Sequence, residues 1–138
     1  MTRLAVGLGC DRGTPAATIA QAVDFALAQL GFVRGQVAAL ASIDLKADEV
    51  GLLAFAVERG WSLRFYSAAE LAAVAVPNPS ETVRRHTGTP SVSEAAALLV
   101  GGGSAADLLL EKFKHCGADG RNVTVSVARY LNRILQNE

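Results

Sequence analysis

Two short segments carry most of the side chains that could do chemistry. The first, residues 7–14, holds Cys10 and Arg12 among three glycines, and the second, residues 42–52, holds a hydroxyl, carboxylates and an ammonium group. Each segment follows an apolar run and precedes a helical pattern. Ligands of α/β proteins bind where strands end and helices begin, because helix N-termini and backbone N–H groups converge there. The two segments therefore predict the binding site.

In the first segment, Gly9 and Gly13 predict a tight turn from a strand into a helix. The N–H groups of this turn, up to Thr14, could hold a carboxylate beside Arg12, as helix N-termini hold phosphate. The alternative is a purely structural turn with a solvated Arg12. The glycine spacing is one residue too long for G-x-G-x-x-G, which argues against a nicotinamide site. Cys10 could be a nucleophile, but a small buried cysteine is the commoner case.

In the second segment, Ser42, Asp44 and Lys46 alternate and would point to one side of an extended strand end. Lys46 could pair with a substrate carboxylate or stabilise an oxyanion, and Asp44 could orient the substrate or act as a base. The alternative is that Asp44 caps the next helix and Lys46 is solvated. Glu49 suits the first turn of that helix, where the dipole favours a carboxylate.

Further along the chain, Ser91 and Glu94 form a capping box, which alone would explain both residues. Glu94 could also face a ligand, because the helix that it opens should point its positive end at the same crevice. A basic cluster is either solvated or faces the substrate: Lys112, Lys114, His115 and Arg121. Because no cysteine and histidine spacing matches a zinc site, we expect no metal and no cofactor.

The composition excludes several classes of protein. The 138 residues fit one domain, residues 1–138, with 51% hydrophobic residues. Thirteen basic residues balance thirteen acidic ones, so no overall field attracts nucleic acid or an anionic membrane. Two cysteines fit a reducing cytoplasm, and the first apolar run is too short for a signal peptide or a membrane span. We therefore expect a cytoplasmic protein that binds neither nucleic acid nor membrane.

Apolar runs and helical patterns alternate along the chain. The apolar runs predict strands at residues 3–9, 37–43, 61–66, 107–113 and 123–127. Caps and spacing predict helices at residues 15–30, 46–59, 67–74, 80–87, 91–101 and 129–138, with Thr14 capping the first, and a polar loop at residues 115–121. Alternating elements with near-continuous apolar strands predict a three-layer α/β/α sandwich with a mostly parallel central sheet.

Four ordered motifs give the chain a resemblance to a known family. They are Gly-x-Gly-Cys-x-x-Gly-Thr at residues 7–14, Ser-Ile-Asp-x-Lys-x-x-Glu-x-Gly-Leu at 42–52, Gly-x-x-Ser-Val-x-Glu-Ala-Ala-Ala at 88–97 and Thr-Val-Ser-Val-Ala at 124–128. Each motif is weak alone, but their order and spacing together are specific. The chain resembles the CbiG/CobE family of cobalamin biosynthesis, namely the C-terminal domain of the larger CbiG proteins and the short, free-standing CobE form.

The resemblance implies an α/β/α domain whose ligand is a ring-contracted precorrin. Larger relatives open a lactone ring on a cobalt-precorrin and release a two-carbon fragment. A precorrin carries many carboxylates around an apolar macrocycle, so its site should offer N–H groups, Arg, Lys and apolar surface. The chain is then either a hydrolase-like enzyme or a precorrin binder without catalysis, with other enzymes of the pathway as further partners. A nucleotide-binding α/β domain is the third alternative.

These arguments select ten candidate site residues. The candidates for substrate binding are Gly9, Cys10, Arg12, Gly13, Thr14, Ser42, Lys46 and Ser91. The candidates for catalysis are Glu94 and Asp44.

Overall fold

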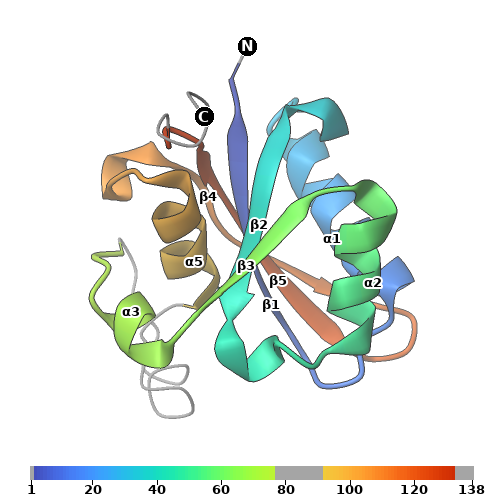
Figure 1. Ribbon diagram of the computed structural model, residues 1–138. Coiled ribbons are helices and arrows are strands. Elements are labelled where there is room, and N and C mark those ends of the chain that lie inside the picture. Colours follow the sequence, from blue (N-terminus) through green and yellow to red (C-terminus); the bar gives the residue numbers. More distant parts are fainter. Residues whose placement is uncertain (1, 77–91, 133–138) are drawn as a thin grey trace.

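The computed structural model describes residues 2–76 and 92–132 and contains a five-stranded sheet in the order β3-β2-β1-β5-β4 (Figure 1). The strands are β1 (Leu4–Cys10), β2 (Val37–Ile43), β3 (Ser62–Tyr66), β4 (Leu108–Cys116) and β5 (Asn122–Arg129). The α-helices are α1 (Ala16–Gln29), α2 (Val50–Arg59), α3 (Ala68–Ala72) and α5 (Val92–Gly101). Three short 3-10 helices are η1 (Arg34–Gln36), η2 (Asp44–Lys46) and η3 (Ala105–Asp107).

The sheet is parallel on one side and antiparallel on the other. Strands β1, β2 and β3 are parallel neighbours, as predicted. Strand β5 is antiparallel to β1, and β4 is antiparallel to β5. The prediction of a mostly parallel sheet is therefore wrong for this side, because a short turn joins β4 directly to β5 and a hairpin makes an antiparallel pair. The polar loop predicted at residues 115–121 is shorter than expected, since β4 continues through Cys116.

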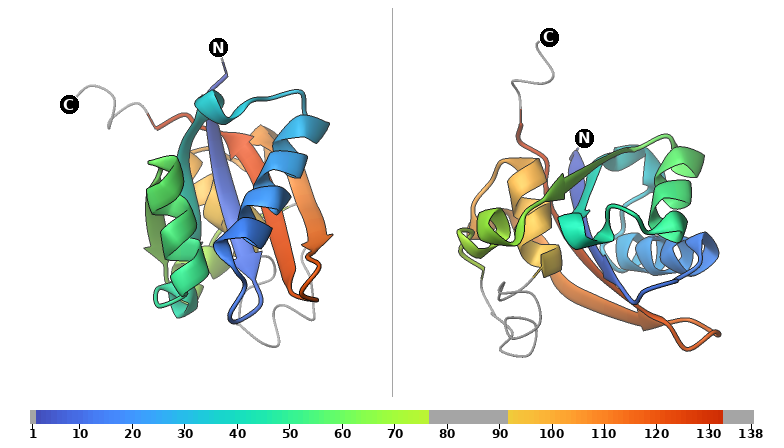
Figure 2. Two further views of the ribbon diagram at one scale, coloured as in Figure 1. Left: turned by 90° about the vertical axis from the view of Figure 1, so that its right-hand side faces the viewer. Right: turned by 60° about the horizontal axis from the view of Figure 1, so that its bottom comes forward.

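Helices pack on both faces of this mixed α/β sheet (Figure 2). Leu4, Val6 and Leu8 of β1 pack with α1 and α2, whereas Ala5 of the same strand packs with α5. This alternation follows from the two-residue period of a strand. The α5 face is lined by small side chains, and a Cβ built on Gly7 would lie 1.9 Å from the carbonyl oxygen of Ser93. Helix α5 therefore packs almost directly on the backbone of β1.

Several predicted boundaries differ from the structure. Helix α1 has Pro15 as its N-cap, because the Thr14 hydroxyl donates to the carbonyl oxygen of Asp11 (2.6 Å) and caps no helical N–H. Helix α2 begins at Val50 rather than at residue 46, because residues 44–46 form η2. The capping box that opens α3 is confirmed.

Predictions near the two gaps are only partly testable. The helix predicted at residues 129–138 is wrong for residues 129–132, which end β5 and continue without helix. Residues 80–87, residues 133–138 and Ser91 lie outside the described residues. Among the helices that are described, none has the length and apolar character needed to cross a bilayer.

Candidate functional site

Glu49 fastens the loop after β1 to the loop after β2. It is the buried N-cap residue of α2, and both of its carboxylate oxygens accept from the Gly13 N–H, at 3.2 and 3.1 Å. One of these oxygens lies 3.6 Å from an Arg12 nitrogen. A Cβ built on Gly51 would lie 2.0 Å from the Thr14 carbonyl oxygen, so the first turn of α2 touches the same loop. The Gly13 N–H predicted to hold a substrate carboxylate thus already binds a carboxylate of the chain.

Arg12 is paired within the chain but remains accessible. Its guanidinium donates to Asp48 at 2.8 Å, and 61% of its side chain is exposed. The hydrogen bond from Arg12 lowers the pKa of the Asp48 carboxyl group. On its other side the loop is held by β5, because Asp11 accepts from the backbone N–H of Asn122 at 2.7 Å. The loop is therefore fixed, and Arg12 presents a partly paired cation at its surface.

Cys10 lies half-buried at the end of β1, near Lys46. Burial raises the pKa of the Cys10 thiol, and the positive charge of Lys46 opposes this effect without cancelling it. The thiolate is the nucleophilic form of cysteine, so a raised pKa keeps Cys10 in its unreactive form near neutral pH. The structural alternative for Cys10 fits this environment better than a catalytic role.

The predicted alternation of Ser42, Asp44 and Lys46 along one strand end is wrong, because β2 ends at Ile43 and η2 begins at Asp44. Ser42 is fully buried, and its hydroxyl donates to the carbonyl oxygen of Leu8 at 2.7 Å. Ser42 therefore joins β1 to β2. Asp44 is exposed and Lys46 is half-buried, both on η2 at the carboxyl end of the sheet. The structure thus places Lys46 and Asp44 at this end and turns Ser42 inward.

A second polar group lies buried between α5 and the sheet. Glu94, on the first turn of α5, is fully buried, and its Oε1 lies 3.6 Å from the Nζ of Lys112. A bulge in β4 places both Glu111 and Lys112 opposite Ser126. Bulges redirect side chains, and this one turns Lys112 toward α5. Beside the ion pair, the Ser126 hydroxyl hydrogen-bonds the Ser93 hydroxyl (2.8 Å) and donates to the Glu111 carbonyl oxygen.

Beyond the first turn of α5, the residues that the structure describes leave part of the same face of the sheet uncovered. Gly9, Thr124 and Lys114 stand opposite one another on β1, β5 and β4. They face the α5 side, because Gly7 and Ser126, two residues away on β1 and β5, both contact α5. Of the described residues, none has an atom within 4 Å of a Cβ built on Gly9, apart from its chain neighbours. We call Gly9, Thr124 and Lys114 the open row.

The sequence indicated a different role for the glycine in this row. Gly9 was expected to form the turn, but it lies within β1 and has no positive φ, whereas Gly13 has a φ of 80° and makes the turn. Thr124 was not among the candidate residues, and Lys112 was expected in a surface cluster. Only the strand register could have placed Thr124 beside Gly9, and only the bulge brings Lys112 to Glu94.

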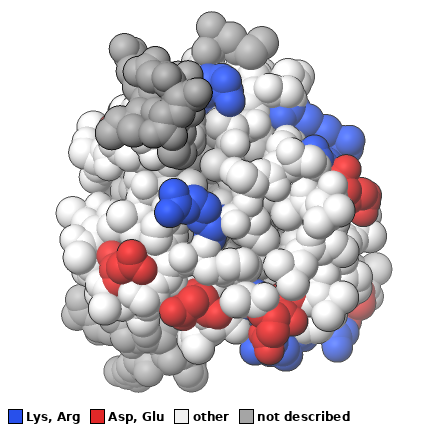
Figure 3. All heavy atoms as spheres, viewed as in Figure 1, with Lys and Arg blue, Asp and Glu red and all other residues white. Residues whose placement is uncertain are grey.

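Charged side chains of both signs gather along the lower edge of the molecule in Figure 3, where the loops after β1 and β2 lie in Figure 1. Within residues 2–76 and 92–132, no group of three or more His, Cys, Asp or Glu side chains is arranged to hold a metal ion. The carboxyl end of the sheet thus combines an exposed polar rim with the open row. Ser91 lies outside the described residues, so its predicted contact is not placed.

Comparison with known proteins identifies the family. Residues 4–128 match the family described as "Cobalamin synthesis G C-terminus". The chain is 43% identical to cobalt-precorrin-5A hydrolase of Priestia megaterium over 91% of its own length but only 32% of that protein. It is 42% identical to protein CobE of a Sinorhizobium species, over 79% of this chain and 71% of that protein.

The fold agrees with that assignment. The crystal structure of CobE, a protein from the cobalamin (vitamin B12) biosynthetic pathway, superposes with a TM-score of 0.75 at 33% identity, covering 94% of this chain and 92% of that one. The four sequence motifs, the family match and this likeness agree, and the chain belongs to the cobalamin synthesis G C-terminal family, which includes CobE.

Proposed function

We propose that this protein binds a ring-contracted precorrin, an intermediate of cobalamin biosynthesis, at the carboxyl end of its sheet. The observation that carries the proposal is the open row, a stretch of sheet surface with one glycine, one hydroxyl and one ammonium group side by side. Family membership supports the choice of ligand, because relatives of both lengths carry names from the same pathway.

The chemistry of the row suits a flat, polyanionic ligand. Gly9 has no side chain and lets a macrocycle approach the sheet, while the Thr124 hydroxyl and the Lys114 ammonium can each bind a peripheral carboxylate. The positive end of α5, which begins at Val92, lies on the same face and favours negative charge. Lys46, at the adjoining rim, adds a further cation.

The remaining candidates then divide by role. Arg12 can contact a carboxylate at the edge of the ligand, since its guanidinium is partly exposed. Gly13, Thr14 and Ser42 hold the two loops in place through the contacts described above, so we assign them to positioning rather than to contact. Cys10 packs against the hydrophobic core that β1 shares with α1 and α2.

The test is a titration of the protein with successive precorrin intermediates, recorded as absorbance shifts and as product mass. We expect a shift without a change of mass. A charge-assisted hydrogen bond contributes about 1.5–3 kcal/mol, so Lys114→Ala and Lys46→Ala should each weaken binding by roughly 10-fold to 100-fold. Arg3→Ala is the matched control, because Arg3 is also an exposed cation but precedes β1 at the opposite end of the sheet. Equal losses in all three variants would contradict the site.

A hydrolase is the second candidate, favoured by the 43% identity to cobalt-precorrin-5A hydrolase. In that case Glu94 or Asp44 would act as the general base. Glu94→Gln cannot accept a proton as a carboxylate does, so an enzyme that uses Glu94 would lose turnover and keep precorrin binding. A product that has gained water or lost a small fragment would establish the enzyme. Unchanged precorrin mass, with binding intact, would establish the binder.

A further inference from the structure

The structure separates the four members of the basic cluster that the sequence indicated. Lys112 lies beside Glu94, and Lys114 belongs to the open row. The ring of His115 packs on α1, on the other face of the sheet. Arg121 is exposed in the turn between β4 and β5. Its contacts therefore decide whether it is only solvated or is placed to bind a ligand.

The guanidinium group of Arg121 is held against the loop that follows β1. Its Nε donates to the carbonyl oxygen of Arg12 at 3.3 Å. A Cβ built on Gly13 would lie 3.4 Å from Nε and 3.6 Å from Nη2 of Arg121, so this edge of the guanidinium lies over the bare backbone of Gly13. The Nη1 and Nη2 end of the group is left for another acceptor. A side chain that is already held in place loses less conformational freedom when it binds a ligand.

Arg121 has no carboxylate partner in the part of the chain that the structure describes. No carboxylate oxygen there lies within 4.0 Å of its guanidinium nitrogens. Two aspartates are close, but each accepts from a backbone N–H instead. Asp119 accepts from the N–H of Arg121 itself at 3.0 Å. Asp11 accepts from the N–H of Asn122 at 2.7 Å. The positive charge of Arg121 is therefore not neutralised by the aspartates beside it.

Arg12, on the same rim, differs in this respect. Its guanidinium donates to Asp48 at 2.8 Å and to the carbonyl oxygen of Leu45 at 3.3 Å. A second carboxylate, that of Glu49, lies 3.6 Å away. A ligand carboxylate at Arg12 would therefore meet two carboxylates of the chain, which repel it. Of these two arginines, Arg12 fastens the loops together and Arg121 presents its charge to the solvent.

We propose that Arg121 binds a peripheral carboxylate of the ligand and is the main arginine contact of the site. The inference rests on the proposed function, because it takes the ligand to be polyanionic. The end of a guanidinium offers two parallel N–H groups, which match the two oxygens of a carboxylate. Arg121 pairs with Gly117 across the β4–β5 hairpin, three residues from Lys114, or about 10 Å at the rise of a strand. The two cations therefore suit two different carboxylates of one macrocycle.

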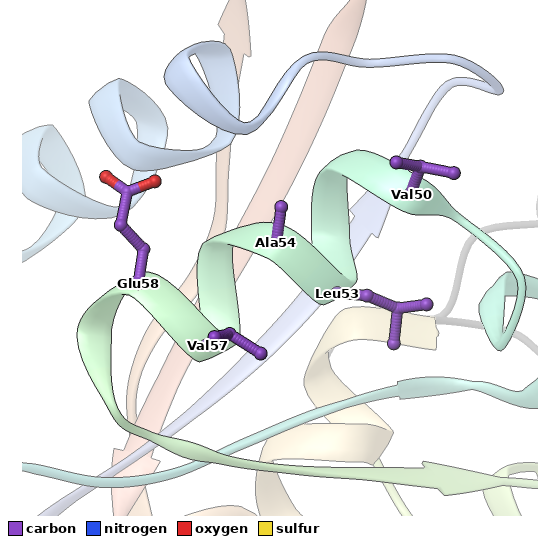
Figure 4. Close-up of a pocket in the computed structure, with 5 residues that line it drawn as sticks. All are labelled: Val50, Leu53, Ala54, Val57 and Glu58. Atoms are coloured by element: carbon purple, nitrogen blue, oxygen red, sulfur yellow. The ribbon is translucent and has the colours of Figure 1, made fainter.

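The outer face of α2 offers the opposite chemistry. It carries a hollow lined by four apolar side chains and one carboxylate: Val50, Leu53, Ala54, Val57 and Glu58 (Figure 4). None of these five side chains can form an ion pair with a ligand carboxylate. The distribution of charge therefore directs a polyanionic ligand toward the β4–β5 hairpin rather than toward this face of α2.

Precorrin titrations of four variants test the assignment. Arg121→Ala should weaken binding by about 10-fold or more, because a charge-assisted hydrogen bond is lost. Arg121→Lys keeps the charge without the parallel N–H groups and should recover only part of the loss. Arg12→Gln should weaken binding by less than about 3-fold, since Arg12 is already paired.

Arg3→Ala is the matched control, because Arg3 is also exposed and no carboxylate of the described residues lies within 4.0 Å of it. It precedes β1 at the opposite end of the sheet, so binding should not change. Thermal unfolding should show that all four variants remain folded. If Arg121→Ala bound precorrin as wild type does, or lost no more affinity than Arg12→Gln, the inference would be wrong and the site at the open row would stand.

Side-chain NMR with citrate separates this inference from the choice of ligand. The Nε–Hε signals report on each guanidinium group, and single substitutions assign them. Citrate at concentrations on the order of millimolar should give saturable shifts at Arg121, compared with chloride at equal ionic strength, and none at Arg3. Such shifts in a protein that binds no precorrin would support the carboxylate contact and reject the proposed ligand. Shifts no larger at Arg121 than at Arg3 would overturn the inference.

Discussion

Gly7 and Gly9 of β1 both lie on the α5 side of the sheet, but only Gly7 is in close contact with α5. Substituting each by alanine tests this packing directly. A Cβ built on Gly7 would lie 1.9 Å from the Ser93 carbonyl oxygen and 2.7 Å from the Ala97 nitrogen. Both are backbone atoms, so no side-chain rotation can relieve the overlap. To restore ordinary contact, α5 must move away from β1 by about 1.5 Å. At Gly9, two residues on, an added Cβ would meet no other described residue within 4 Å, apart from its chain neighbours.

The expected magnitudes follow from these distances. Overpacking a core costs about 1–3 kcal/mol, and displacing α5 would also strain the Ser93 to Ser126 hydrogen bond and the Glu94 to Lys112 pair. We therefore expect Gly7→Ala to lower the free energy of unfolding by about 3 kcal/mol or more. For a domain of this length that corresponds to a fall in Tm of roughly 10 °C. Gly9→Ala should be neutral or stabilising by up to about 1 kcal/mol, because glycine weakens a strand.

Thermal and urea unfolding, followed by circular dichroism, measure both variants under the same conditions. The comparison on one strand removes the general effect of replacing a strand glycine. If the Tm of Gly7→Ala lay within about 2 °C of that of Gly9→Ala, the close approach of α5 to β1 would be wrong.

Three further perturbations test the polar contacts. Lys112→Met should lower the free energy of unfolding, measured in urea, by about 3–5 kcal/mol, because the Glu94 carboxylate stays buried without the Lys112 ammonium group. Adding Glu94→Leu to the same chain should restore most of this loss. A double variant as unstable as Lys112→Met alone would argue against the ion pair. Burial acts to raise the pKa of Asp24, but hydrogen bonds from two arginines outweigh it and lower the pKa overall. The stability that Asp24 contributes is therefore fully present above its unfolded pKa near 3.9, and it is lost as the pH falls through the lower pKa of the folded state. The difference in free energy of unfolding between wild type and Asp24→Asn should thus shrink below about pH 4. In a Cys116→Ser background, the pH midpoint for alkylation of Cys10 should lie above that of cysteine in an unfolded peptide; a lower midpoint would indicate an activated thiolate.

The sequence was most informative where a periodic pattern was long. The runs that became β1 and β2 and the apolar spacing of α1 predicted those elements to within a few residues, because burial imposes a strict period on each. The capping box of α3 was equally clear, since its two residues need only each other. The direction of β5 was not predictable in the same way, because a strand reads alike whether its neighbour is parallel or antiparallel.

The site was less predictable because its contacts join distant parts of the chain. The sequence located Glu49 in the first turn of a helix, but not its bond to the Gly13 N–H on another loop. It treated residues 44–46 as a strand end, since three residues of 3-10 helix show no period. The open row depends on the register of three strands, and no local pattern connects Gly9 with Lys114.

Amide NMR spectra of the protein titrated with a ring-contracted precorrin test the central claim most directly, because they locate the ligand without relying on catalysis. We predict saturable shifts at the amides of Gly9, Thr124 and Lys114, smaller ones around Lys46, and none along the outer face of α2. Gly9→Val adds a β-branched side chain at a position where an added Cβ meets no other described residue within 4 Å, apart from its chain neighbours, and it should abolish these shifts. Saturable binding that leaves the open row unperturbed, or that persists unchanged in Gly9→Val, would contradict the account.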